Sequence, residues 1–230
     1  MHPIKKYLPN TLICCNLLTG CIAISFGFHG NLKVAFIFII LGVLFDFLSS
    51  LTIYLFNVSS KFVKELDNLA DIITFGVAPS VMVFYHLRQL ICPSFLEPID
   101  GILPYSAFLI AAASALRLAK FNLDERQKNT FIGLPTLANA LFWGGILMLQ
   151  SKYENSPAFY LLMLFLVFVS SSLLVSGIPM FSLKFKTINW KENRFCLFFL
   201  ATAVLLLFIL SLPAFAIIVT WYVILSMIRK

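Results

Sequence analysis

The chain has 230 residues, of which 60% are hydrophobic and only 12% are charged, and its mean hydropathy is +0.95. Soluble domains are about half apolar and about one quarter charged, so a soluble fold is excluded and lipid must form part of the solvent. The net charge of +7 does not indicate a nucleic-acid partner, because the basic residues are spread among connecting segments and form no single patch.

Apolar segments long enough to cross a membrane recur along the whole chain. A spanning helix needs about 20 mostly apolar residues, within a range of about 17–25. The last two segments are short, and Leu212-Pro213 separates them, which favours a tight hairpin. Eight spans are predicted, at roughly 11–28, 32–56, 67–88, 102–121, 134–150, 157–178, 195–211 and 213–228.

Lysine and arginine fix the orientation expected for these spans. Of the 17 basic residues, three (Lys33, Arg88 and Lys152) fall in segments on one side, and the other fourteen fall on the opposite side. Segments rich in lysine and arginine stay in the cytoplasm. We therefore expect an all-α, multi-pass protein of the inner membrane, a single membrane domain over residues 1–230 with both termini in the cytoplasm.

Three carboxylates interrupt this apolar pattern near one membrane edge. Asp46 lies past the midpoint of the second span, and Asp67 and Asp71 open the third. A carboxylate inside a spanning helix costs roughly 2.5–3.5 kcal/mol on insertion scales, and such residues usually mark functional sites. Asp67 and Asp71 are four residues apart and share one helix face. The hairpin of the two spans brings all three acids to a similar depth on the cytoplasmic side.

Three converging carboxylates repel one another unless a cation lies between them. Hard oxygen ligands suit Mg²⁺ or Mn²⁺, and the open positions of such an ion bind a pyrophosphate. The alternative is that Asp67 and Asp71 only cap the third span and pair with Lys61 and Lys64, which leaves Asp46 unexplained.

A second polar group lies at the cytoplasmic end of the fourth span. Arg117 and Lys120 are three residues apart on one helix. They could hold a phosphate or a substrate carboxylate, Arg117 through two parallel hydrogen bonds. Ordinary basic flanking of a membrane helix explains the same spacing equally well.

These residues resemble the bacterial phosphatidylserine synthase branch of the CDP-alcohol phosphotransferases. The family motif reads D-x2-D-G-x2-A-R-x8-G-x3-D-x3-D across the second and third spans. The spacing of this motif is intact here, and three of the motif's four aspartates are present. The residues at the motif positions are Asp46, Ser49, Ser50, Ile53, Tyr54, Val63, Asp67 and Asp71.

The resemblance extends beyond the motif, over about residues 5–145. It includes Leu8-Pro9-Asn10 with Asn16 to Gly20, and segments 64–80, 116–122 and 133–139. It implies a phosphotransferase-like core at residues 1–150, with residues 151–230 as additional C-terminal transmembrane helices. A homodimer is compatible with the resemblance, and the residues themselves neither support nor oppose it.

The resemblance implies transfer of a phosphatidyl group from CDP-diacylglycerol to L-serine, giving phosphatidylserine and CMP. By position, Asp46 and Asp67 would be ligands of Mg²⁺ or Mn²⁺, one or two ions. Asp71 would be the base that takes the serine proton and would also lie near the metal. Ser49, Ser50 and Tyr54 would fall in the nucleotide site. This site would face the cytoplasm, where serine and CMP are found.

Five positions depart from the motif, and the departures leave alternatives open. Ser49 removes one carboxylate, and Tyr54 cannot supply the positive charge of the family's arginine. Ser50, Ile53 and Val63 add side-chain volume where the family has glycine or alanine. The chain is therefore either an active synthase with an altered, single-metal site or a non-catalytic paralogue that binds lipid, nucleotide or a partner. A small transporter that uses the acids as an ion site is a third, weaker hypothesis.

Overall fold

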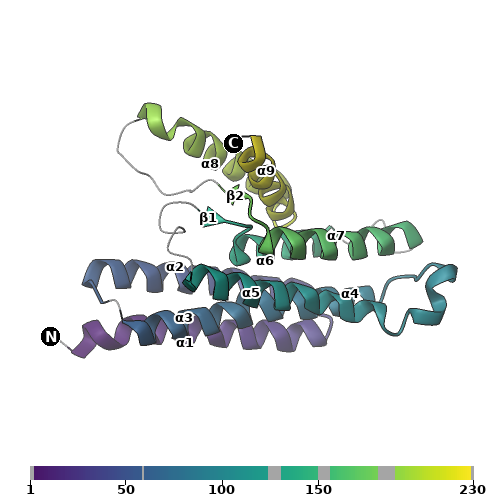
Figure 1. Cartoon of the computed structure of the whole chain (residues 1–230), viewed down its shortest axis with the longest axis horizontal. Coiled ribbons are helices and arrows are strands. Elements are labelled where there is room, and N and C mark those ends of the chain that lie inside the picture. Colours follow the sequence, from purple (N-terminus) through teal and green to yellow (C-terminus); the bar gives the residue numbers. More distant parts are fainter. Residues whose placement is uncertain (1–2, 59, 124–130, 150–155, 181–189, 229–230) are drawn as a thin grey trace.

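The computed structural model describes residues 3–58, 60–123, 131–149, 156–180 and 190–228 (Figure 1). In chain order the elements are α1 (Pro3–Phe28), α2 (Leu32–Phe56), α3 (Lys61–Asp71), the π-helix η1 (Ile72–Val77), α4 (Ala78–Leu87), the 3-10 helices η2 (Ser94–Ile99) and η3 (Leu103–Phe108), α5 (Leu109–Leu123), β1 (Phe131–Ile132), α6 (Thr136–Leu147), α7 (Pro157–Val175), β2 (Pro179–Met180), α8 (Trp190–Leu210) and α9 (Ala214–Ile228).

Four helical segments of the described chain are long and apolar enough to cross a membrane: Tyr7–Phe28, Leu32–Phe56, Lys61–Leu87 and Pro157–Val175. They correspond to the first, second, third and sixth predicted spans. The other four predicted ranges coincide with α5, α6, α8 and α9, and their crossing of the membrane stays a prediction. The all-α class is confirmed for the described residues, except that β1 and β2 form an antiparallel pair of two residues each, which is too short to leave a periodic signal in the sequence.

The second span has the predicted bounds, whereas the third begins six residues earlier than predicted. Asn31 caps the start of α2, and Asn57 ends it in the left-handed conformation at φ 52°. Helix α3 begins at Lys61 because the Ser60 hydroxyl accepts a hydrogen bond from the Val63 N–H at 3.2 Å. Three of the six extra residues, Lys61, Lys64 and Glu65, are charged and exposed, so hydropathy alone did not detect this part of the helix.

Most helices follow one common direction (Figure 1). Helices α1 and α2 pack against each other and against the continuous helix formed by α3, η1 and α4, while α5, α6 and α7 lie next to them (Figure 1). Helices α8 and α9 cross this direction at the top of the view. The N-terminus and the connection between α2 and α3 lie at the left end, and η2 and η3 lie at the opposite end.

Close approach of α1 to η1 requires glycine at position 20. A Cβ added to Gly20 would lie 2.8 Å from the Thr74 Cα and would also overlap the Thr74 hydroxyl. Because a backbone atom blocks the space, the helices would have to separate, and overpacking of this kind costs about 1–3 kcal/mol. We expect Gly20→Ala to lower the thermal unfolding temperature in detergent. Gly101→Ala, where nothing lies within 4 Å of the added Cβ, should leave it unchanged; equal behaviour of the two variants would contradict this packing.

Candidate active site

The structure brings together the three carboxylates predicted to converge. One oxygen from each of Asp46, Asp67 and Asp71 lies within 4.8 Å of the other two, and all three side chains are half-buried. Asp46 comes from α2, and Asp67 and Asp71 share one face of α3. The hairpin between these helices sets the common depth, since Asp46 lies ten residues before the end of α2 and Asp67 lies six after the start of α3.

The carboxylate cluster fits a divalent cation. Three like charges at this spacing repel one another, and the repulsion is stronger than in water because half-burial lowers the local dielectric constant. The Oδ1 atom of Asp67 is buried and has no hydrogen-bond partner among the described residues. Carboxylate oxygens are the ligands that Mg²⁺ and Mn²⁺ prefer. An unsatisfied carboxylate oxygen in an acidic cluster is what a missing cation would leave.

A buried asparagine of α1 holds the third carboxylate. The Asn16 Nδ2 donates a hydrogen bond to Asp71 Oδ1 at 3.2 Å. The Asn16 backbone carbonyl accepts hydrogen bonds from the Thr19 hydroxyl at 2.7 Å and from the Thr74 hydroxyl at 2.9 Å. The family resemblance in the sequence includes Asn16 but gives it no role. The signal that could have found it is an amide side chain within an apolar run, because such a group is costly to bury without a partner.

A π-helix follows Asp71 directly and gives η1 a wider turn than the helices on either side. Short π-segments inside α-helices occur often at functional sites. Here Thr74 of η1 reaches Asn16. On another side of η1, Gly76 faces α5, where a Cβ would lie 3.1 Å from the Ser114 Cβ. The segment after Asp71 therefore contacts α1 and α5 at the same level.

The two predicted basic residues lie in different environments. Arg117 is only 8% exposed and interacts electrostatically with Asp71 and with Tyr222 of α9. Its Nε and the Ser114 hydroxyl are buried without a hydrogen-bond partner in the part of the chain that the structure describes. Lys120 is exposed, one turn further along. Of the pair, Arg117 therefore belongs to the surroundings of the acidic site, whereas Lys120 lies on the surface.

The three residues assigned by resemblance to a nucleotide site also differ. The Ser49 side chain is buried, and its hydroxyl donates to the Asp46 backbone carbonyl at 2.8 Å. Ser50 is exposed, and Tyr54 is 82% exposed. Ser49 therefore uses its proton within α2, and because a hydroxyl is uncharged it does not supply the negative charge of the family's aspartate.

The other two departures from the family motif pack together. Val63 of α3 is buried against Ile13 of α1 and Ala70, and Ile53 of α2 packs against the same cluster. Two larger side chains thus fill one space between α1, α2 and α3. Both departures therefore fall in the same hydrophobic cluster.

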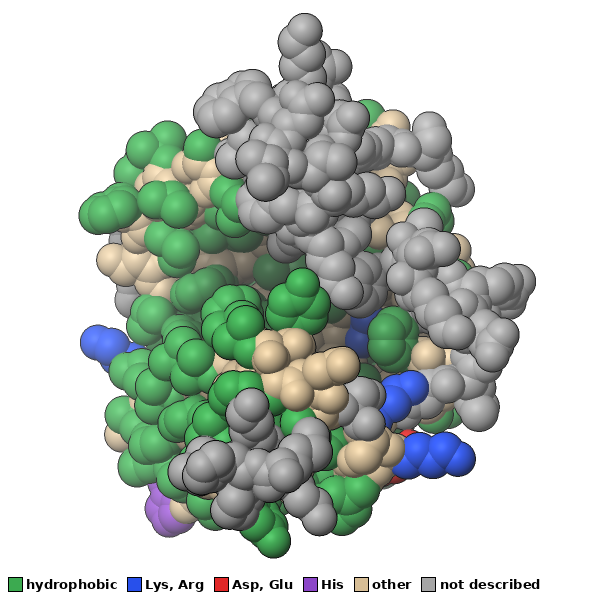
Figure 2. Space-filling view, turned by 90° about the vertical axis from the view of Figure 1, so that its left-hand side faces the viewer, with side chains coloured by type: hydrophobic (Ala, Val, Ile, Leu, Met, Phe, Trp, Pro, Cys, Tyr) green, Lys and Arg blue, Asp and Glu red, His purple; other side chains and the backbone are tan. Residues whose placement is uncertain are grey.

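Basic side chains gather on one part of this end of the molecule. Figure 2 looks onto it and shows several Lys and Arg side chains on one side, with hydrophobic side chains over much of the other side. Lys61, Lys64 and Lys120, at this end of α3 and α5, are all exposed. Exposed basic side chains therefore lie at the same end of the molecule as the acidic site.

The fold and the site define a helical membrane protein with an acidic centre, able to hold a divalent cation, between two neighbouring helices. The sequence profile of the CDP-alcohol phosphatidyltransferase family matches residues 6–181, well over half of the chain. The chain belongs to this family. The match extends beyond the predicted range of 5–145 and includes α6 and α7, while α9 lies outside it.

Similar proteins in other organisms carry related names. A CDP-diacylglycerol–serine O-phosphatidyltransferase of Bacillus subtilis is 33% identical over 130 residues, which are 56% of this chain and 69% of that protein. One from Helicobacter pylori is 28% identical over 227 residues, 96% of this chain and 90% of its own length. An archaetidylserine synthase of Methanothermobacter thermautotrophicus is 28% identical over 175 residues, 71% of this chain and 67% of that protein.

Proposed function

We propose that the chain transfers the phosphatidyl group of CDP-diacylglycerol to L-serine, with release of CMP. The observation that carries this proposal is the convergence of Asp46, Asp67 and Asp71 in a chain of this family. The names of the similar proteins support serine as the acceptor. The position of the acids at a membrane edge suits a substrate whose acyl chains stay in lipid while its nucleotide stays in water.

In the proposed reaction, Asp46 and Asp67 would hold Mg²⁺ or Mn²⁺, and Asp71 takes a proton. A divalent cation held there would supply positive charge against the pyrophosphate. The serine hydroxyl oxygen forms a bond to the phosphorus that carries the diacylglycerol, the bond from that phosphorus to CMP breaks, and the hydroxyl proton passes to the Asp71 carboxylate. The hydrogen bond from Asn16 orients the Asp71 carboxylate for this transfer.

Arg117 is the residue we assign to the acceptor. Its buried guanidinium can pair with the serine carboxylate, and its unpartnered Nε among the described residues leaves a donor for this purpose. The electrostatic interaction with Asp71 supports a position near the base. Lys120 is exposed and would contribute only to the approach of charged substrates.

For the membrane arrangement, we infer eight spans, both termini in the cytoplasm, and an active site that faces the cytoplasm. The distribution of basic residues supports this orientation, because the acidic site and the exposed Lys61, Lys64 and Lys120 lie at the same end. A homodimer is not needed for the proposed chemistry, since one chain supplies the three aspartates and Arg117.

A second candidate function follows from the altered half of the motif. The Ser49 hydroxyl bonds within its own helix, and Ile53 and Val63 fill a space between three helices. These observations favour weaker binding of the nucleotide. If that binding is too weak for catalysis, the chain is a relative that binds lipid or nucleotide without turnover.

Release of CMP from CDP-diacylglycerol by the purified protein distinguishes the two candidates. We expect release that requires both serine and Mg²⁺ or Mn²⁺, and a larger rate in the variant Ser49→Asp/Ser50→Gly/Tyr54→Arg, which restores a carboxylate and a cation to the nucleotide site. If the natural protein releases no CMP while the triple variant does, the non-catalytic candidate is supported. Release with glycerol phosphate or inositol phosphate and not with serine would contradict the acceptor.

A further inference from the structure

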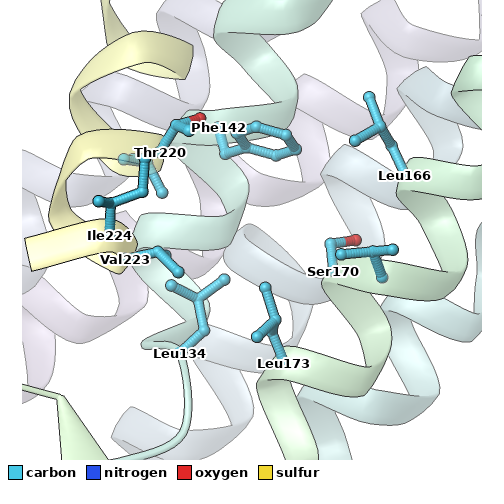
Figure 3. A pocket seen from close by; sticks show the side chains of 10 residues that line it. Leu134, Phe142, Leu166, Ser170, Leu173, Thr220, Val223 and Ile224 are labelled. Carbon is cyan, nitrogen blue, oxygen red and sulfur yellow. The ribbon is translucent and has the colours of Figure 1, made fainter. Parts of the chain in front are cut away.

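An apolar cavity lies between α6, α7 and α9, separate from the acidic site. Its volume is about 180 Å³, and its walls come from Leu134 just before α6, Phe142 on α6, Leu173 on α7, and Val219 and Val223 on α9 (Figure 3). The side chains in Figure 3 point into this space from both sides, with α7 on one side and α9 on the other.

The two hydroxyl groups that line the cavity are already satisfied. The Ser170 hydroxyl accepts a hydrogen bond from the Trp143 Nε1 at 3.2 Å and donates to the Val167 carbonyl at 3.3 Å. The Thr220 hydroxyl donates to the Ala216 carbonyl at 2.8 Å. The lining therefore offers little to a water molecule, which needs two to four polar partners. A polar head group would lose its hydration here without replacement. The apolar lining of the cavity therefore favours a hydrocarbon ligand.

The cavity opens toward the lipid-facing side of the helices. Ile224 on its rim is 43% exposed, and Thr220 is exposed as well. Helix α7, which is long and apolar enough to span a membrane, exposes Phe165 and Phe168 beside the lining residues Leu166 and Val169. The medium around such a surface is the acyl region of the bilayer.

We propose that this cavity binds part of an acyl chain of a membrane lipid. An apolar cavity of about 150 Å³ remains dry and takes up a hydrocarbon the size of benzene, so a space of this volume holds several carbons of a chain. Burial of hydrocarbon against Leu134, Leu173 and Val223 fills space that would otherwise lack van der Waals contacts. The chain comes either from the nucleotide-linked lipid substrate or from a bulk phospholipid.

Helix α9, which forms one side of the cavity, lies outside the region that the family profile matches. The family profile ends at residue 181, before α9 begins at Ala214. Helix α9 packs closely on α6, where a Cβ on Gly145 would lie 3.0 Å from the Ala216 Cβ. This contact holds α9 in the position that closes the cavity, so the site depends on a helix outside the matched region.

Quenching of Trp143 by brominated lipid tests the proposal without reference to activity. Trp190→Phe and Trp221→Phe leave Trp143 as the single tryptophan of the three in the chain. Trp143 is fully buried and bonded to Ser170 in the cavity wall. In vesicles of phosphatidylcholine with brominated acyl chains we expect strong quenching. Val223→Phe, which fills the cavity, should remove most of it, and Ile217→Phe, on the exposed face of α9, should not.

Each result decides the proposal. Equal quenching in Val223→Phe and Ile217→Phe, or none in the parent protein, would overturn it; a milder filler, Val223→Leu, gives the same comparison if the phenylalanine variant does not fold. Recovery of fluorescence by a few unbrominated CDP-diacylglycerol molecules per protein would assign the chain to the substrate. Recovery only in proportion to the share of unbrominated lipid in the bilayer would assign it to bulk lipid. A protein without any CMP release could still show this quenching, so the cavity and the proposed reaction fail independently.

Discussion

Asp71→Asn is expected to reduce CMP release by about 10²–10⁴-fold, which is the usual contribution of a general base. Asparagine has the same shape as aspartate, and its oxygen can still accept the hydrogen bond that Asn16 donates to Asp71. The variant therefore keeps the packing and loses the proton acceptor. The measurement is the rate of CMP release at saturating serine and CDP-diacylglycerol.

Asp100→Asn is the matched control. Asp100 accepts a hydrogen bond from the Tyr160 hydroxyl at 3.0 Å and lies in the connection between η2 and η3, at the opposite end of the molecule (Figure 1). This variant should have the natural rate. If Asp71→Asn also kept the natural rate, Asp71 would not be the base.

Asn16 provides a second check on the same step. Asn16→Ala removes the donor that orients the Asp71 carboxylate, and misplacement of a catalytic group by about 1 Å can cost about 10²-fold. In the Asp71→Asn background the same change should have little further effect, because the group that it positions no longer takes a proton. Additive losses would show that Asn16 acts independently of the Asp71 carboxylate and would contradict the positioning role.

Asp67→Asn is expected to have the second large effect, on metal binding. Two unit charges about 4 Å apart interact by about 4 kcal/mol at an effective dielectric constant near 20, and a divalent cation doubles this energy. Removing one carboxylate charge should therefore weaken the binding of the cation by at least about a thousandfold. Titration of Mn²⁺ followed by electron paramagnetic resonance measures this directly. CMP release should fall with it.

The control for this variant lies on the same helix. Glu65 is exposed near the start of α3 and is not among the three clustered acids. Glu65→Gln removes the same charge from the same end of the molecule, and it should leave Mn²⁺ affinity within a few-fold of the natural protein, because exposed charges are screened by solvent. Equal losses in both variants would mean that the effect comes from net charge and not from ligation.

Several features followed from the sequence alone. The bounds of α2 followed from the length of a mostly apolar run, and the structure adds the caps at Asn31 and Asn57. The convergence of Asp46, Asp67 and Asp71 followed from two regular rules, the depth shared by the two arms of a hairpin and the four-residue spacing on one helix face. Family membership followed from a motif whose spacing survives the loss of several of its residues.

Other features were decided by the tertiary structure, because they depend on contacts between residues far apart in the chain. Asn16 and Asp71 are 55 residues apart, and only the packing of α1 on α3 makes one the partner of the other. The packing of Ile53 and Val63 with the distant Ile13 in one cluster also depends on which helices meet. The same is true of the burial of Arg117 as opposed to the exposure of Lys120. The cavity beside α9 exists only because α6, α7 and α9 pack together. Hydropathy and spacing describe each helix by itself, whereas the partners of a buried polar group, and the space left between helices, exist only after the helices have packed.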